Sequence, residues 1–145
     1  MKTLLIIFAF IATGPVEWLN DFEAAKTIAG QNHKYILLNF SGSDWCAPCI
    51  KMKQEVFEND AFLRVAEKQL VLIRADFPRA KKNQLSKEQQ RHNEALAEIY
   101  NPAGKFPYTL LLDADGKILR EWDGYTFSSQ DKFIGQLSKE LKMED

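Results

Sequence analysis

The sequence predicts an α/β protein whose central mixed sheet is covered by helices on both faces. Helical and strand-like segments alternate along most of the chain, an order typical of parallel strands joined by helices. Two short apolar runs, residues 35–38 and 70–76, indicate buried strands that helices separate, so we expect them to run parallel. Later, Asp113-Ala114-Asp115-Gly116 is a turn signal between two further strands, which predicts an antiparallel hairpin.

The first residues have the layout of a secretory signal peptide. Met1-Lys2-Thr3 carries one positive side chain, an apolar run of nine residues follows from Leu4 to Ala12, and Gly14 ends the segment. Spanning a bilayer takes about 20 residues. We therefore expect residues 1–14 to be a removable leader, residues 15–145 to form a single domain, and no stable membrane insertion after removal. A buried N-terminal strand and an uncleaved anchor are the alternatives.

Helical spacing of apolar residues recurs after this segment. A helix is expected over residues 17–30, because Trp18, Phe22 and Ala25 share one face and Gly30 is suited to a C-terminal cap. Residues 50–57 show the same spacing. Asn59 or Asp60 can then cap a short helix that carries Phe62, Leu63 and Ala66.

The second half of the chain continues with a polar segment and two more helices. Residues 79–84 are polar and basic, and Ser86-Lys87-Glu88-Gln89 has the form of a capping box that opens a helix. Only the second half of this helix shows a core-facing stripe, formed by Ala95, Leu96, Ile99 and Tyr100. After the hairpin, a final helix is indicated by Phe133, Ile134, Leu137 and Leu141.

The chain has two cysteines, Cys46 and Cys49, between the first apolar run and the helix that follows it. We expect Cys46 at or just before the helix N-terminus, where unpaired N–H groups and the macrodipole stabilise a thiolate. Cysteines in such pairs reach pKa values of about 3.5–7.5. Cys46 is therefore predicted to be the exposed nucleophile that forms a mixed disulfide, and Cys49 the resolving thiol. Pro48 fits the first helical turn, where its missing N–H costs little.

Other uses of the cysteine pair are weaker. A structural metal site needs about four ligands, and only His33 and His92 could join the cysteines, neither at a ligand-like spacing. An inert structural disulfide or two idle thiols remain as alternatives. Asp44 acts against the thiolate, because a nearby carboxylate disfavours a second negative charge.

Trp45-Cys46-Ala47-Pro48-Cys49 after an apolar strand resembles the active site of the thioredoxin superfamily. A second matching element is Phe106-Pro107, a proline that opens an apolar run. The resemblance covers nearly everything from about Trp18 to the C-terminus and is strongest to secreted bacterial thioredoxin-like proteins. It implies a thioredoxin fold in which Pro107 is cis and packs beside the cysteine pair, where neighbouring backbone groups receive the substrate chain.

The resemblance implies a thiol–disulfide oxidoreductase that needs no organic cofactor and no metal. A cysteine-containing protein substrate is expected to bind in extended form over Trp45, Ala47, Pro48, Phe106 and Pro107. The retained proline between the cysteines favours a reductant, whereas the helix terminus acts in the opposite direction. The implied partners are such protein substrates and a membrane or soluble thiol that donates electrons, in an exported, periplasmic or extracellular location.

Two positions depart from the thioredoxin pattern: Ala47, where thioredoxins have Gly before the retained Pro48, and Asn39. Asn39 occupies the strand position where thioredoxins carry a buried Asp that helps to move the proton of the resolving thiol. An amide is not a base, so the proton of Cys49 must move through water or another group. The alternatives to a reductant are a disulfide isomerase or oxidase, a noncatalytic thioredoxin-fold module that binds peptides, and a metallochaperone.

Composition limits the partners further. The chain has 19 Lys and Arg against 20 Asp and Glu, a formal net charge of -1, which argues against a nucleic-acid partner. With 46% hydrophobic residues and ten Phe, the chain can form a stable core without disulfide bonds. The cysteines are therefore available for chemistry rather than needed for stability.

Overall fold

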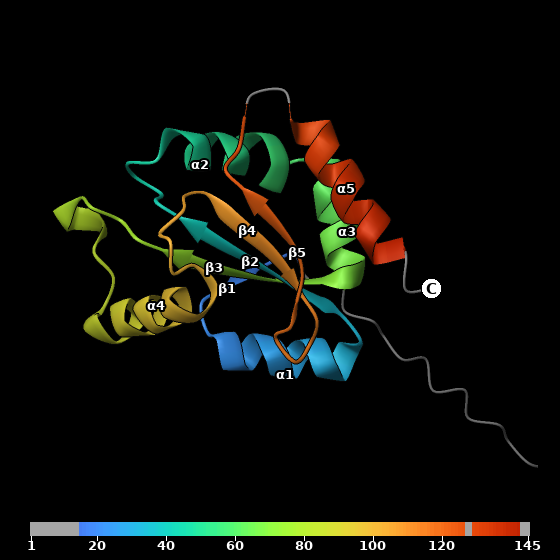
Figure 1. The fold of residues 1–145 in the computed structure, drawn as a ribbon, viewed down its shortest axis with the longest axis horizontal. Helices are drawn as coiled ribbons and strands as arrows, with labels where there is room; N and C mark the ends of the chain where they lie inside the picture. The colour runs from blue at the N-terminus through green and yellow to red at the C-terminus, as the bar shows by residue number, and fades with distance from the viewer. Residues whose placement is uncertain (1–14, 127–128, 143–145) are drawn as a thin grey trace, which may run out of the picture.

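The structure, a computed structural model, describes residues 15–126 and 129–142, which form a five-stranded mixed sheet with helices on both faces (Figure 1). The predicted α/β architecture is confirmed. The strand order across the sheet is β1-β3-β2-β4-β5. The strands are β1 (Trp18–Leu19), β2 (Tyr35–Ser41), β3 (Leu70–Asp76), β4 (Tyr108–Leu112) and β5 (Ile118–Asp123).

Strands β2 and β3 both end at the edge of the sheet where the cysteines lie. They run parallel, with Tyr35 opposite Leu70 and Ser41 opposite Asp76, so both strands end at the same edge of the sheet. Strand β4 is antiparallel to β2, and β5 is antiparallel to β4. The predicted parallel pair and the predicted hairpin are both present. The ends of β2 and β3 therefore lie beside the start of β4.

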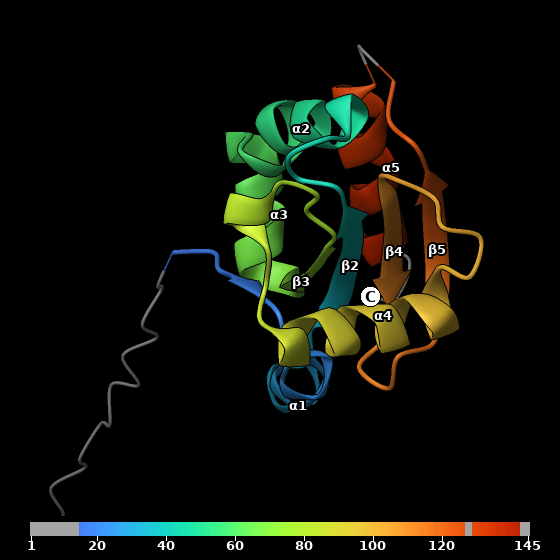
Figure 2. The same cartoon turned by 90° about the vertical axis from the view of Figure 1, so that its left-hand side faces the viewer.

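The described helices divide between the two faces of the sheet (Figures 1 and 2). Side chains alternate along β2, so Ile36, Leu38 and Phe40 enter one core and Leu37 enters the other. The first core is covered by α1 (Phe22–Asn32) and α4 (Lys87–Tyr100). The second is covered by α2 (Ala47–Met52), the π-helical turn η1 (Lys53–Phe57), α3 (Asp60–Gln69) and α5 (Gln130–Lys142).

The helix predicted over residues 17–30 is wrong at both ends. Trp18 lies in the short edge strand β1, which pairs with β3. The helix begins only after Asp21, whose side chain accepts a hydrogen bond from Ala24 N (3.1 Å). It continues past Gly30 and ends at His33, which takes the left-handed conformation with φ of 52°.

The buried face of α4 also differs from the predicted stripe. Ile99 is 71% exposed, whereas Asn93 and Leu96 are buried. The Asn93 amide donates to the carbonyl of Asp76 at the end of β3 (2.9 Å). A buried polar anchor therefore sets the rotation of this helix, which a count of apolar residues does not reveal.

The predicted leader, residues 1–14, lies outside the described residues. In the stretches that are described, no helix combines the length and the apolar composition needed to cross a membrane.

Candidate active site

The cysteine pair lies at the junction of β2 and α2, as the sequence predicts. After β2 the chain turns, and Cys46 N donates to the carbonyl of Gly42 (2.9 Å). Cys46 is the N-cap residue of α2, with extended backbone angles, and Pro48 lies in the first turn. The two cysteines form a disulfide, and their Cα atoms are 5.2 Å apart.

Both cysteines are buried in this oxidised state. Cys46 is 5% exposed and Cys49 is 4% exposed, so the greater exposure predicted for Cys46 is not visible here. The backbone N–H of Cys49 donates to Cys46 Sγ (3.3 Å). When the disulfide opens, this N–H and the helix dipole favour negative charge on that sulfur. The arrangement is suited to a nucleophilic Cys46.

Trp45 belongs to an aromatic surface that three separate segments build. Its indole Nε1 donates to the carbonyl of Phe77 (2.7 Å). Its ring meets Phe106 edge to face, with centroids 5.4 Å apart, and Phe106 meets Phe77 at 5.6 Å. Gly42 lies so close to the indole that a Cβ there would overlap the ring. The indole orientation is therefore fixed from both sides.

Residues 106 and 107 reach this surface through the pairing of β4 with β2. The register places Tyr108 opposite Phe40, just before the chain turns toward the cysteines. The Phe106–Pro107 peptide bond is cis. Pro107 is buried, and its carbonyl accepts a hydrogen bond from Gly124 N (2.9 Å). The structure thus brings together Trp45 and Phe106, two residues that the sequence assigned to substrate binding.

Ala47 and Pro48 line a separate hollow of about 300 Å³ together with Lys51 and Tyr125. Tyr125 follows β5, and its hydroxyl donates to a carboxylate oxygen of Glu55 in η1 (2.6 Å). Burial, and then this bond, raise the pKa of Tyr125 to about 12. The predicted contact residues therefore form two neighbouring features, the aromatic surface and this hollow.

Asp44 contacts the segment after β3. Its carboxylate accepts hydrogen bonds from the backbone N–H groups of Arg79 and Ala80 (both 2.9 Å) and from the Asn83 side chain (3.0 Å). These bonds, led by the one from Arg79, lower the pKa of Asp44. Its negative charge is thus directed at N–H donors. These donors weaken the electrostatic repulsion between Asp44 and a Cys46 thiolate that the sequence suggests.

A polar cavity of about 330 Å³ lies behind Cys49. Asn39 lines it and is 2% exposed, and its amide donates to the hydroxyl of Thr109 (3.0 Å). Asp76 contributes the carboxylate of the lining, which otherwise includes Ser41, Ser43, Lys53 and Arg74. A cavity of this size and polarity can hold several water molecules.

The charged side chains of this cavity differ in how many hydrogen-bond or ion-pair partners they have. Asp76 accepts hydrogen bonds from the Ser43 backbone (2.9 Å) and hydroxyl (2.5 Å), and Lys53 pairs with Glu58. Within the described part of the chain, Arg74 Nε is buried without a hydrogen-bond partner. Burial lowers the pKa of Arg74, while the carboxylates of Asp76 and Glu58 oppose that shift.

The two histidines considered as metal ligands lie in other places. His33 ends α1, and His92 Nε2 accepts a hydrogen bond from Phe22 N (3.2 Å). Across residues 15–126 and 129–142, no three His, Cys, Asp or Glu side chains are grouped as a metal site would require.

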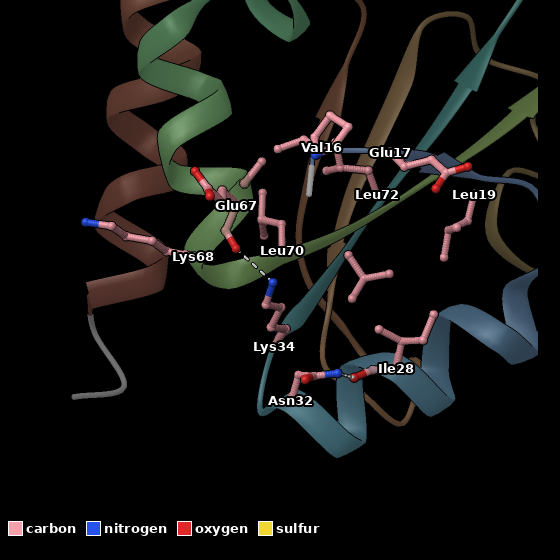
Figure 3. A pocket seen from close by; sticks show the side chains of 13 residues that line it. Val16, Glu17, Leu19, Ile28, Asn32, Lys34, Glu67, Lys68, Leu70 and Leu72 are labelled. Atoms are coloured by element: carbon pink, nitrogen blue, oxygen red, sulfur yellow. Dashed lines mark hydrogen bonds between the residues drawn. The ribbon is translucent and has the colours of Figure 1, made fainter. Parts of the chain in front are cut away.

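A larger cavity, of about 640 Å³, lies at the opposite end of the sheet (Figure 3). It is lined mainly by aliphatic residues of β1, α1 and the start of β3, and Lys34 Nζ donates across it to the carbonyl of Glu67 (2.8 Å). No residue predicted for the site lines this cavity. The hollow at the cysteines is therefore smaller than the hollow remote from them.

Sequence reasoning missed four residues of the site: Phe77, Asp76, Arg79 and Tyr125. The sequence indicates Asp76 only as the last residue of a strand and Arg79 only as part of a polar, basic segment, and it marks no role for Phe77 in the site. A signal existed for Asp76, because the parallel strands 35–41 and 70–76 must end at one edge. Tyr125 has no local signal, since only the packing of β5 beside β4 brings it to α2.

Comparisons with known proteins agree with this geometry. A family model described as a thioredoxin-like domain matches residues 22–140. A disulfide bond reductase, DsbH of Chlamydia pneumoniae, is 33% identical over 133 residues, which cover 92% of this chain and 77% of the relative. A solved structure of a DsbH oxidoreductase superposes with a TM-score of 0.77 at 30% identity, covering 99% of this chain and 96% of the other.

A more distant structure shares the fold. The C-terminal domain of DsbD from Neisseria meningitidis has a TM-score of 0.53 at 23% identity, covering 81% of this chain and 90% of that domain. With the DsbH structure, it bears out the thioredoxin fold expected from the sequence.

Proposed function

We propose that this chain, which belongs to the thioredoxin-like family, is a thiol–disulfide oxidoreductase that works as a reductant of disulfides in exported proteins. The observation that carries the proposal is the Cys46–Cys49 disulfide at the N-terminus of α2. The reductant direction is supported by the relative named a disulfide bond reductase and by Pro48 between the cysteines. The export is supported by the composition of residues 1–14.

The reaction requires two exchanges. In the reduced protein the Cys46 thiolate attacks one sulfur of a substrate disulfide, which forms a mixed disulfide and releases the other substrate sulfur as a thiolate. Cys49 then loses its proton and attacks Cys46 Sγ, which releases the second substrate sulfur. The substrate gains two electrons and two protons, and the Cys46–Cys49 disulfide of the structure is the product. An external thiol, membrane-bound or soluble, must restore the dithiol.

The proton of Cys49 leaves through the cavity behind it. Asn39 cannot accept it, because an amide nitrogen is a donor and its oxygen is a very weak base. Asp76 supplies a carboxylate to the same cavity as Cys49, and water in the cavity can link the two groups. Asp76 is thus a positioning residue for the second exchange.

The substrate chain binds over the aromatic surface and the neighbouring hollow. Trp45, Phe106 and Phe77 offer apolar contact in the aromatic surface, and Ala47, Pro48 and Tyr125 offer it in the hollow. Backbone groups at Phe106 supply strand-like hydrogen bonds to an extended peptide.

Two cysteine variants test this function. Cys46→Ser should abolish reduction of a disulfide substrate, because the attacking sulfur is lost. Cys49→Ser should accumulate mixed disulfides at Cys46, visible by mass spectrometry and released by dithiothreitol. Retained turnover in Cys46→Ser contradicts the assignment of the nucleophile. A Cys49→Ser protein that keeps turnover and traps no substrate contradicts the resolving role.

A further inference from the structure

We propose that the segment after β3, with Arg79, Lys81 and Lys82, is a basic recognition surface that selects protein substrates with acidic residues beside their disulfide. We call these three residues the basic flank. The inference rests on the proposed function, since it names the chemical class of its substrate. Figure 2 looks onto this end of the molecule, with the segment between β3 and α4 in the foreground.

The segment is held firmly although it is exposed. Asp44, two residues before Cys46, accepts three hydrogen bonds from Arg79, Ala80 and Asn83. The Gln84 amide donates to the carbonyl of Pro78 (3.0 Å), and residues 81–83 form a 3₁₀ turn. The backbone of a segment tied in this way loses little freedom when a partner binds.

The basic flank begins at the redox centre. The Arg79 guanidinium lies over the Trp45 ring, with Cζ 3.7 Å from the ring centroid. Trp45 in turn directly precedes Cys46 and contacts Phe106. A substrate that lies over the aromatic surface therefore also lies against Arg79, the first residue of the basic flank.

These cations are available to a partner. Arg79, Lys81 and Lys82 are exposed, and none takes part in the ion pairs that link described residues. Other cations around the site are already neutralised: Lys51 pairs with Glu55, and Lys105 pairs with Asp123. The Asp44 carboxylate is occupied by N–H donors of the same segment.

The overall charge makes this local feature selective. The whole chain carries a formal charge of -1, so it has no general attraction for polyanions such as nucleic acid. A cluster of unpaired cations at the active site instead attracts local negative charge on a partner and speeds its encounter. Acidic side chains near a substrate disulfide provide that charge.

The test compares three cyclic disulfide peptides that differ only in whether glutamate, glutamine or lysine flanks the disulfide. We expect the reduced protein to reduce the glutamate peptide about tenfold faster than the lysine peptide at low salt. The preference should fall to less than about twofold in 1 M salt, where the Debye length is about 3 Å. In the double variant Lys81→Glu/Lys82→Glu, the preference should disappear or reverse.

The matched control is Lys68→Glu/Lys117→Glu, which makes the same change in charge at exposed positions of the opposite end of the sheet. This control should keep the wild-type preference. Equal rates for the three peptides, or the same loss of preference in both double variants, overturn the inference while leaving the reductase function intact. Failure to reduce even the glutamine peptide instead contradicts the proposed function.

The same proteins also test whether the basic flank binds a membrane surface or DNA instead of a protein substrate. If the flank variant weakens binding to phosphatidylglycerol vesicles or to DNA without changing peptide preference, the surface does not select substrates, and the inference is wrong.

Discussion

At the scale of single residues, a polar cavity lined by both Cys49 and Asp76 takes the place of the buried Asp that thioredoxins carry at the position of Asn39. Asn39 is buried and satisfied by Thr109, so it holds its strand in place without proton chemistry. Asp76 reaches the same cavity as Cys49 from the neighbouring strand, because Ser41 and Asp76 are register partners. Arg74 adds positive charge there, which favours a Cys49 thiolate once the proton has left.

Asp76→Asn should slow the second exchange specifically. With an aromatic disulfide whose thiolate product is coloured, the first release reports attack by Cys46 and the second reports attack by Cys49. We expect the second release to slow about tenfold at neutral pH. The difference in second-release rate between wild type and Asp76→Asn should disappear above pH of about 8.5, where a free thiol ionises without help.

Ser43→Ala is the matched control for Asp76→Asn. It removes the hydroxyl bond to Asp76 and keeps the carboxylate, so the second release should change by less than about twofold. A uniform slowing at every pH, or equal slowing in both variants, would assign Asp76 a structural role only.

At the scale of elements, the described contacts tie the end of β5 to the helical segment that carries the cysteines. Tyr125 follows β5 and binds Glu55 in η1, which continues α2. Glu55 also pairs with Lys51 on α2. The wall of the hollow beside Pro48 is thereby bonded to the helical segment that carries the cysteines, which suits a surface that must present a substrate to Cys46.

Tyr125→Phe should lower the melting temperature by roughly 2–4 °C at pH 7, because one hydrogen bond to a carboxylate is lost. The pKa of Tyr125 is raised to about 12, so this contribution is complete below pH of about 10 and is lost as pH rises through 12. The pKa of Glu55 is lowered, chiefly by Tyr125, so the contribution is also lost as pH falls below the ordinary range of that carboxyl.

The check on Tyr125→Phe is a series of thermal melts across pH. The difference between wild type and variant should be constant from pH 6 to pH 9 and shrink on both sides. A difference that persists unchanged at pH above about 12 would contradict the assignment of the stability loss to the hydrogen bond between the Tyr125 hydroxyl and Glu55.

The elements could be predicted where local pattern and tertiary contact agree. The apolar run at 35–38, the strand over 70–76 and the hairpin at Asp113–Gly116 have strong local signals and are present. The predictions for Trp18, placed in a helix, and for Ile99, placed on a buried face, are wrong because contacts with residues distant in the sequence determine both positions. Trp18 packs on Phe57 and lies under Arg74, and the rotation of α4 follows the anchor of Asn93 on β3.

At the scale of the whole molecule, the site is an edge of the sheet where segments distant in sequence meet. The cysteine motif and Phe106-Pro107 were recognisable as short patterns, and the structure brings Trp45 and Phe106 together. Phe77, Arg79 and Tyr125 were not recognisable, because each contributes through the strand order rather than through its neighbours in the chain. The same strand order brings Arg79 onto Trp45 and Tyr125 beside Pro48, both next to the cysteines in the chain.

The reduction potential of the Cys46–Cys49 pair decides whether the protein works as a reductant. It can be measured by equilibrating the protein with defined thiol–disulfide buffers and quantifying the free thiols. We expect a value near about -270 mV, in the range of thioredoxin. A value between about -180 and -120 mV would contradict the reductant direction and make the protein an isomerase or oxidase.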